Sequence, residues 1–383
     1  MSEVFLLDGA AETALASWDG GLFAELAAGK GGFGPVTRFD ASMLTARSAA
    51  CLEPIPGERR KTENLTQTLL RRILPKFAQL PDIETIVWAG VKGNAEFVEA
   101  GGFQADPPCP FPFLPRDYSH WVRDELGHPQ AGLVEVAAAC ASSTLGLAVG
   151  ADLISSGMSR SVLVVAADIV SRFSFLGFSA LNALSPGACR PFDKDRDGLL
   201  LGDGAAAVLL ADGDYVRKIG RRPLARLSGW GVANDATHIT APARDGRGLI
   251  AAMDSALKRA RLAPRDIGAF SAHGTGTVYN DAMELTALDA VFGDRPFPVF
   301  SIKGAVGHTL GAAGGIEALV SVRALVEGLV PPTLGLVHPE PKAHGRVSGE
   351  AQKFSSRRIM KTNSGFGGVN VALILEEPER SDA

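Results

Sequence analysis

Three residues of this chain combine a reactive side chain with a position at the end of a predicted apolar strand. Cys140 stands in VAAACASSTLGLAVGADL, where an apolar strand is followed by a helix of small residues. His273 and His308 each follow an apolar strand and precede a turn rich in small residues. The N–H groups and the dipole at a helix start lower the pKa of a thiol and can hold an oxyanion. This pattern predicts a cysteine nucleophile and two histidines at one site, with a core cysteine and turn histidines as the alternative.

Charged residues near the two histidines stand among small residues, which predicts that they are buried. Lys303 and Glu317 lie on either side of the second histidine in KGAVGHTLGAAGGIE. Buried opposite charges usually pair, so these two are expected to form an ion pair. Asp281 and Glu284 come shortly after the first histidine and suit the capping of a helix start and the anchoring of the loop before it.

One aromatic residue, Phe366, stands between glycines in NSGFGG. Such a residue can act as a mobile lid, or its backbone N–H can donate to a reacting carbonyl. An ordinary glycine turn is the alternative interpretation.

The elements that would position these residues alternate between strands and helices. A strand that reaches Cys140, a helix to Ser156 and a buried strand over Ser161–Ala167 predict a parallel sheet. Gly202–Leu210 and Gly367–Leu375 are each a Gly-rich bend leading into an apolar strand, which indicates a duplicated α/β unit. Further helices are expected over Glu12–Ala28, Thr62–Gln79 (ended or kinked by Pro75), Gly248–Arg261, Asp281–Phe292 and Gly314–Gly328, and further strands over Ile83–Ala89, Leu224–Val232, Ile267–Ala272 and Phe297–Ile302.

The composition is that of a globular protein with a small negative charge. The chain has 383 residues, of which 46% are hydrophobic and 21% charged, and this excludes disordered and fibrous classes. Its formal net charge of −4 provides no global positive field for nucleic acid. The uncharged stretches Val136–Ala151 and Phe173–Cys189 are shorter than the ~20 residues of a membrane span and are interpreted as buried segments.

Two further expectations follow from what the sequence does not contain. The first residues have no basic segment of the secretory type, so the protein is expected in the cytoplasm. Its four cysteines have no CxxC or Cys/His spacing, so no metal site is expected.

Five motifs occur along the chain in one order: CASS, PFDKDRDGLLLGDGA, HGTGT followed by ND and E, KGAVGHTLGAAGGIE and NSGFGG. Together they resemble the β-ketoacyl-(acyl carrier protein) synthases of the elongating type, over about two thirds of the chain from Gly132 onward. The resemblance implies an α/β, thiolase-like fold in which two fused, pseudo-duplicated βαβαβαββ halves form α/β/α/β/α layers. It divides the chain into an N-terminal half, residues 1–212, with the nucleophile and a C-terminal half, residues 213–383, with the histidines and the Gly-rich gate.

The resemblance implies a decarboxylating condensation. Cys140 would take an acyl chain from a carrier-protein or CoA thioester. His273 and His308 would bind the thioester carbonyl of a malonyl-carrier donor, so that the enolate left by decarboxylation attacks the acyl-cysteine. Neutral imidazole N–H groups suit this task, because they stabilise an enolate oxygen without protonating the carbanion. The product would be a β-ketoacyl-carrier in fatty acid, polyketide or polyene biosynthesis.

The resemblance also implies supporting roles for other residues. The backbone N–H groups of Cys140 and Phe366 would form the oxyanion hole, and the Phe366 side chain would gate access. Lys303 would act on the electrostatics of the site through Glu317. The substrate would be contacted by Thr275, Thr277, Ser364 and Gly367, the threonines on its pantetheine arm.

No bound cofactor is implied, because the substrates arrive on the phosphopantetheine of acyl carrier protein or on CoA. The partners implied are this acidic carrier protein and either a second copy of the chain or a related synthase-like subunit. The candidates for a basic landing patch are Arg59, Arg60, Lys61 and Arg196, with a solvated helix start as the alternative reading of the basic run.

The chain departs from the family pattern in several places. Ser364 stands where a second Phe is usual, Asp203 stands where Glu is common, and the opening before Asp8-Gly9 is expected to be shortened or rebuilt. Residues 80–130 match poorly, which leaves the acyl length and the identity of the dimer partner open.

Two other functions remain as alternatives at this stage. One is an acyltransferase of the same fold, and the other is a subunit of an obligate synthase/chain-length-factor heterodimer. A thiolase is disfavoured, because such enzymes generally need a second cysteine late in the chain and none follows Cys189.

Overall fold

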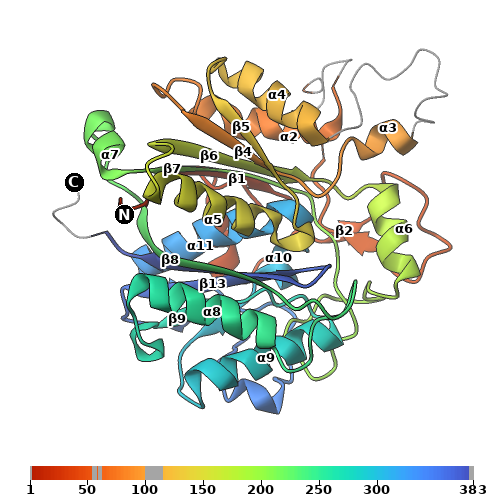
Figure 1. Ribbon diagram of the computed structural model, residues 1–383. Coiled ribbons are helices and arrows are strands. Elements are labelled where there is room, and N and C mark those ends of the chain that lie inside the picture. The colour runs from red at the N-terminus through yellow and green to blue at the C-terminus, as the bar shows by residue number, and fades with distance from the viewer. Residues whose placement is uncertain (1, 54–57, 59–62, 100–114, 379–383) are drawn as a thin grey trace.

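The computed structural model describes residues 2–53, 58, 63–99 and 115–378. Ten strands form one sheet in the order β10-β9-β13-β14-β8-β1-β7-β6-β4-β5. In its middle, β1 (Phe5–Thr13) and β8 (Ala225–Asn234) pair only through Phe5↔Arg226 and Leu6↔Ala225. The sheet therefore consists of two five-stranded sections, which lie one above the other in Figure 1.

The two sections have the same internal pattern. From the outer edge to the junction, each has two parallel pairings followed by two antiparallel ones. The expected duplication is confirmed by this pattern, because the two similar Gly-strand segments form β7 and β14, which occupy equivalent positions. The remaining strands of the first section are β5 (Gly132–Val136), β4 (Thr85–Ala89), β6 (Ser161–Asp168) and β7 (Gly204–Ala211), and those of the second are β10 (Val299–Phe300), β9 (Ala269–Ser271), β13 (Arg358–Gly365) and β14 (Val369–Glu376).

Helices fill the space between the sections and cover their outer faces (Figure 1). The central pair is α5 (Ser142–Ser155) and α11 (Ala313–Glu327). One outer face carries α2 (Leu65–Ile73) and α4 (Pro115–Leu126), and the other carries α8 (Arg247–Ala260) and α9 (Val278–Phe292). The five layers expected from the resemblance are confirmed, whereas the division at residue 212 stays a prediction.

The central helices approach each other closely because one contact residue has no side chain. A Cβ added to Gly314 of α11 would lie 2.0 Å from Thr144 Oγ1 and 2.7 Å from Thr144 N of α5. Any larger residue there would push the two helices apart. The same contact keeps Thr144 next to the second section of the sheet.

Shorter elements complete the described structure. Among the described residues, no helix is both long and apolar enough to cross a bilayer. The shorter helices are α1 (Leu22–Ala27), α3 (Ala95–Glu99), α6 (Arg172–Ala180), α7 (Gly213–Ile219) and α10 (Lys303–Val306). Single 3-10 turns lie at Leu74–Lys76, Ala139–Ala141, Pro264–Asp266, Leu310–Ala312 and Pro341–Ala343. Two short strand pairs are β2 (Gly34–Pro35) with β3 (Ser48–Ala49) and β11 (Leu329–Val330) with β12 (Gln352–Lys353).

Two expectations for the N-terminal region are wrong. The helix expected over Glu12–Ala28 begins only at Leu22, because β1 continues to Thr13 and Gly21, at φ +91°, starts the short α1. The opening is also not shortened, since β1 runs through Asp8-Gly9 with one register shift. Pairing with β7 and β8 in the middle of the sheet outweighs the local helical pattern.

The interpretation of Phe173–Cys189 as a buried segment is also wrong. Its first part forms α6, on which Phe173 is 61% exposed, and Leu181 just after the helix is 52% exposed. Only Phe175 of this helix packs fully into the core, because α6 lies at the edge of the layers rather than between them.

Candidate active site

The cysteine proposed as nucleophile lies at a sharp turn between β5 and α5. The strand ends at Val136, four residues earlier than expected, and the chain then turns through Ala139, whose φ is +47°. Ser142 holds the turn, because its hydroxyl accepts from Ala138 N (2.9 Å) and donates to Ala139 O (2.7 Å). Cys140 therefore stands directly before the first turn of α5, with 6% of its surface exposed.

The state of the thiol differs from the sequence expectation. Burial raises the pKa of Cys140 to about 12, and the positive charge of Lys303 offsets this only in part. The nearby carboxylates Asp168 and Glu317 oppose the thiolate as well. This direction is opposite to the lowered pKa expected from the helix start, because removal of the sulfur from water disfavours the thiolate. Cys140 is a neutral thiol at neutral pH.

We therefore expect alkylation of Cys140 by iodoacetamide to be slow at pH 7. Its rate should rise by roughly tenfold per pH unit between pH 8 and 10, since the thiolate fraction grows in that proportion below the pKa. Mass spectrometry of the Cys140 peptide measures this rate separately from the other cysteines. A rate that levels off near pH 7 would contradict the neutral thiol.

His273 follows β9 in a loop that two buried carboxylates of α9 hold in place. Glu284 accepts from His273 N (2.7 Å) and Gly274 N (2.6 Å). Asp281 accepts from Thr275 N at 3.0 Å and from the next amide at 3.1 Å. Burial, together with the charge of Asp281, raises the pKa of Glu284 to about 7. The expected loop anchoring is confirmed.

His308 reaches the same place from the short helix α10. Its backbone N–H donates to Leu200 O (2.7 Å), and its ring Nδ1 accepts from Leu310 N (3.3 Å). The proton of the neutral ring is therefore on Nε2. That Nε2 is buried and has no hydrogen-bond partner among the described residues. It is therefore available to donate to a ligand oxygen.

The two imidazoles form one unit. Their ring centroids are 5.2 Å apart and their planes cross at 80°. Burial lowers the pKa of both His273 and His308 well below the ordinary value, and the charge of Lys303 lowers both further. Both rings are neutral at neutral pH, so they can donate hydrogen bonds to a carbonyl oxygen without carrying a net charge.

A buried ion pair contacts His273 on the side that faces away from the cavity. Lys303 pairs with Glu317, and both are almost completely buried, which confirms the expected pair. The ammonium also donates to His273 O (2.5 Å) and lies 3.3 Å from His273 Nδ1. Lys303 therefore contacts the histidine and Glu317 pairs with Lys303, and neither residue lines the cavity in front of His273.

Sequence reasoning missed two residues of β13 that belong to this cluster. Asn363 Nδ2 lies 2.8 Å from His273 Nδ1, and Lys361 Nζ lies 3.3 Å from Glu317 Oε2. The sequence did contain a signal for them. Lys361 and Asn363 are two residues apart on a strand and therefore share one face of it, and polar side chains on the buried face of an apolar strand require partners. The motif NSGFGG drew attention to its aromatic residue instead.

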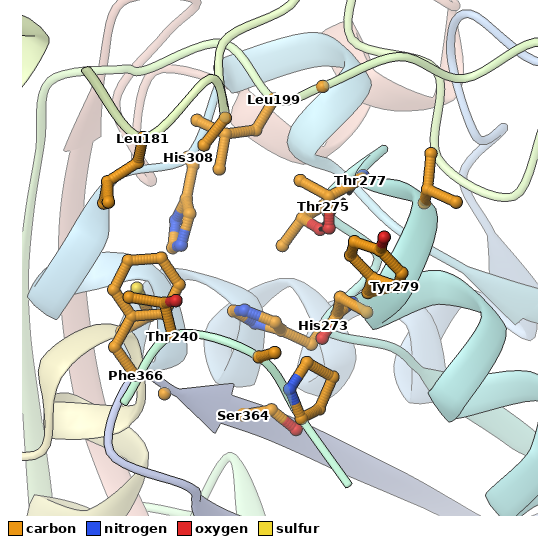
Figure 2. Close-up of a pocket in the computed structure, with 18 of the residues that line it drawn as sticks. Leu181, Leu199, Thr240, His273, Thr275, Thr277, Tyr279, His308, Ser364 and Phe366 are labelled. Carbon is orange, nitrogen blue, oxygen red and sulfur yellow. Dashed lines mark hydrogen bonds between the residues drawn. The ribbon is translucent and has the colours of Figure 1, made fainter. Parts of the chain in front are cut away.

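The reactive groups converge on a cavity of about 400 Å³ (Figure 2). At its wall the ring of Phe366 lies 5.8 Å from that of Phe178 of α6. A Cβ added to Gly365 would lie 2.5 Å from Ala138 O, so the gate turn packs directly on the nucleophile turn. Of the residues selected from the sequence, the cavity is lined by Cys140, His273, Thr275, Thr277, His308, Ser364 and Phe366, together with Phe178, Leu181, Leu199, Thr240 and Tyr279, which sequence reasoning did not select.

Two residues that the sequence analysis assigned to substrate or carrier binding do not line the cavity. Gly367 is not among the lining residues, and its N–H donates to Ile239 O (2.7 Å). The assignment of Arg196 to a landing patch is wrong. Arg196 is only 8% exposed, pairs with Glu340 at 2.6 Å and donates to Val278 O at 3.2 Å. These internal partners leave it no free face. Arg59, Arg60 and Lys61 lie outside the described residues.

Two unusual positions in the motifs have local partners. Ser364 Oγ donates to Asn370 Oδ1 (2.7 Å), and Asn370 Nδ2 donates to Asp235 Oδ1 (2.9 Å). The site thus has a hydrogen-bonded hydroxyl where a second aromatic ring would fill space. Asp203 is fully buried and accepts from Val170 N (2.6 Å), so its role is structural.

One group of described residues brings possible metal ligands together, away from the cavity. The ligand atoms of Asp193, Asp195 and His338 lie within 4.8 Å of one another. However, Asp193 already accepts from His338 N (2.6 Å), Val337 N (2.6 Å) and Asp195 N (2.8 Å). Its carboxylate is occupied by backbone donors, which indicates a structural role.

Family comparisons match both halves of the chain. The family "Beta-ketoacyl synthase, N-terminal domain" matches residues 130–214, and "Beta-ketoacyl synthase, C-terminal domain" matches residues 224–337. These matches include the cysteine turn and both histidine loops.

Curated proteins from several bacteria are similar to this chain. The 3-oxoacyl-(acyl-carrier-protein) synthase 2 of Rhizobium meliloti is 40% identical over 216 residues, which is 54% of this chain and 51% of that protein. A Streptomyces halstedii protein named as a polyketide β-ketoacyl synthase 1 is 33% identical over 287 residues, 72% of this chain and 68% of that protein. The aligned region thus spans about half the length of the first relative.

A solved structure extends the similarity to nearly the whole chain. The ishigamide ketosynthase/chain length factor is 28% identical, with a TM-score of 0.88 over 99% of this chain and 100% of that chain. The N-terminal region, which the family comparisons leave unmatched, therefore has the same fold as well.

Proposed function

Because the chain belongs to the β-ketoacyl synthase family, we propose that it condenses an acyl thioester with a malonyl thioester held on a carrier protein. The observation that carries this proposal is the convergence of a buried cysteine and two neutral histidines on one cavity. The products are a β-ketoacyl thioester and CO₂. The product class is that of fatty acid, polyketide or polyene biosynthesis.

The first half-reaction is acyl transfer to Cys140. The sulfur attacks the thioester carbonyl, the thiol proton passes to the departing pantetheine sulfur, and an acyl-cysteine forms. The backbone N–H groups of Cys140 and Phe366 are the proposed oxyanion hole. The close packing of the gate turn on the nucleophile turn supports this role. The ring of Phe366 then gates the acyl chain.

The second half-reaction uses the histidines. The Nε2–H groups of His273 and His308 donate to the carbonyl oxygen of the malonyl thioester. The C–C bond to the carboxylate breaks, CO₂ leaves, and its electron pair forms an enolate on that oxygen. The enolate carbon then attacks the acyl-Cys140 carbonyl, and the cysteine sulfur leaves and regains a proton. Neutral rings suit this step, because they stabilise the enolate without protonating it.

The rest of the cavity is proposed to hold the pantetheine arm. Thr275 and Thr277 lie on one wall, with their hydroxyls 2.9 Å apart, and both line the cavity. Ser364 lies on the opposite side in Figure 2. This arm arrives covalently attached to the substrate, so no resident cofactor is proposed.

Lys303 and Glu317 are proposed to act on the electrostatics of the site through the contact of Lys303 with His273.

The carrier protein is proposed to dock at the cavity mouth. Tyr279 lines the cavity and is 59% exposed, and the guanidinium of Arg244 lies 5.7 Å from its ring. Arg247, also exposed, lies on the same loop and helix start. These arginines supply the positive charge that an acidic partner requires. A soluble carrier of this kind favours the cytoplasm as the place of action.

A dimer is proposed through the edge of the large sheet. β5 is the last strand in the sheet order, and its first residue, Gly132, is exposed. An unpaired edge strand offers its N–H and C=O groups to another strand. The partner is either a second copy or a synthase-like subunit, and the similarity to a ketosynthase/chain length factor supports the second form. Native mass spectrometry of the purified protein distinguishes them.

The proposal is tested by incubating the enzyme with acyl-carrier and malonyl-carrier substrates of several acyl lengths. We expect a β-ketoacyl-carrier and an equal amount of CO₂. Absence of both at every chain length, for the chain alone and with a co-purified partner, would contradict the proposal. Transfer of the acyl group to an alcohol or amine without malonyl-carrier would instead favour the alternative acyltransferase.

A further inference from the structure

Asn363 holds both ends of its side-chain amide in hydrogen bonds. Its Nδ2 donates to Glu317 Oε2 (2.8 Å) and lies 2.8 Å from His273 Nδ1. Its Oδ1 accepts from Lys361 Nζ and from Thr144 Oγ1. All of these groups are buried. The amide therefore has a carboxylate on one side and an ammonium on the other.

This arrangement permits only one orientation of the amide. If the amide were rotated by half a turn, Oδ1 would face the carboxylate of Glu317 and the NH₂ group would face the ammonium of Lys361. Both contacts would then be repulsive in a buried environment, where such contacts are costly. Asn363 therefore always faces His273 with a donor.

A donor at Nδ1 decides which ring nitrogen carries the proton. A neutral imidazole has one donor and one acceptor nitrogen. His273 Nδ1 meets the amide of Asn363 and also lies 3.3 Å from Lys303 Nζ, which is a donor as well. Nδ1 is then the acceptor, and the proton is on Nε2.

Burial of the Lys361 ammonium costs folding free energy, so its presence at this position needs an explanation. Glu317 is already paired with Lys303, so the second fully buried ammonium has to share this carboxylate, with Glu284 as a further negative group that acts on it. Burial lowers the pKa of Lys361 to about 8, and the charge of Lys303 contributes to this. An apolar residue would normally be preferred at such a position.

We propose that Asn363 and Lys361 are positioning residues that hold His273 as the Nε2–H tautomer, with Lys361 orienting the amide and Asn363 donating to the ring. Their effect on malonyl decarboxylation rests on the proposed function. The tautomer itself does not, because it is a property of the resting protein. Lys361 adds a second effect, since its charge disfavours a protonated imidazole.

The direct test is ¹⁵N NMR of the full-length protein labelled with ¹⁵N-histidine at pH 7. A His273→Gln sample identifies the His273 signals. We expect the Nδ1 signal of an unprotonated nitrogen and an Nε2 signal with a bound proton. A proton on Nδ1, or on both nitrogens, would overturn the proposal whether or not any variant folds.

The kinetic test compares the two half-reactions in Asn363→Asp. A carboxylate accepts a hydrogen bond from Nδ1–H and so favours the tautomer with the proton on Nδ1. We expect the rate of malonyl-carrier decarboxylation to fall by about a hundredfold, as for loss of one transition-state donor, while the rate of Cys140 acylation changes by less than about threefold. A merely structural role would lower both rates together. An unchanged decarboxylation rate with the Nε2–H tautomer retained would overturn the proposal.

Lys361→Met, which keeps the length of the side chain, tests the second residue. We expect a smaller loss of about tenfold in decarboxylation, because Thr144 still donates to Asn363 Oδ1. Lys353→Met, on the exposed strand β12, is the matched control and should leave both rates unchanged. An equal effect of the two substitutions would overturn the role of Lys361. If the wild-type enzyme decarboxylates no malonyl thioester, the proposed function is wrong. The NMR measurement then still tests the tautomer of His273, because it needs no substrate.

Discussion

Cys140→Ala is expected to abolish the acyl-enzyme and to lower the rate of condensation by at least about a thousandfold. Cys140 carries the only thiol among the described residues that line the cavity with both histidines. Mass spectrometry of the intact protein after incubation with acyl-carrier measures the adduct, and product analysis measures condensation. Decarboxylation of malonyl-carrier should continue in this variant, because the donors of His273 and His308 remain.

Cys189→Ala is the matched control for this experiment. Cys189 is also a buried thiol with a pKa raised to about 12 by burial, but its Sγ donates to Thr275 O (3.3 Å) and it does not line the cavity. We expect this variant to form the acyl adduct at the normal rate. An adduct that persists in Cys140→Ala and disappears in Cys189→Ala would show that the nucleophile is assigned to the wrong cysteine.

The location of the site was predictable because strand ends are visible in the sequence. Apolar runs that stop at a residue with chemical function identify the carboxyl ends of parallel strands, where ligand sites of such sheets lie. This applied to His273 and His308, and to the paired charges of Lys303 and Glu317. A different signal, the similarity of two Gly-rich bends that each lead into an apolar strand, indicated that β7 and β14 are equivalent.

The chemical state of the site was not predictable in the same way. The pKa of Cys140 depends on how completely neighbouring segments remove the sulfur from water, and those segments are distant in sequence. Arg196 looked like surface charge, yet its partners Glu340 and Val278 come from other parts of the chain. Lys361 received no role from the sequence, because its burial beside Glu317 depends on a contact between segments that are distant in sequence. A local sequence pattern predicts which helix or strand forms. The protonation state and the ion-pair partners of a side chain depend on contacts with residues that are distant in sequence.

His308→Ala is expected to have the largest effect on the second half-reaction. Among the residues that the structure describes, His308 Nε2 is a buried donor with no partner, so it is free to donate to a ligand oxygen. Loss of one such preorganised donor costs roughly a hundredfold to a thousandfold in rate. We expect the rate of malonyl-carrier decarboxylation to fall by this amount, measured as release of labelled CO₂, while acylation of Cys140 continues.

His308→Gln separates the hydrogen bond from the loss of the ring. A glutamine amide can reach about the position of Nε2, so this variant should recover part of the rate that His308→Ala loses. Between pH 6 and 8 both imidazoles should stay neutral, because burial keeps the pKa of both histidines well below that range. Any change of the wild-type rate in this range is then expected from Glu284, with a pKa of about 7, or from Lys361, with a pKa of about 8. A ¹⁵N-histidine NMR spectrum that shows a cationic ring at pH 7 would mean that a protonated imidazole is present in the working enzyme. In that case the donors would act as acids, and a neutral pair that only stabilises the enolate would be excluded.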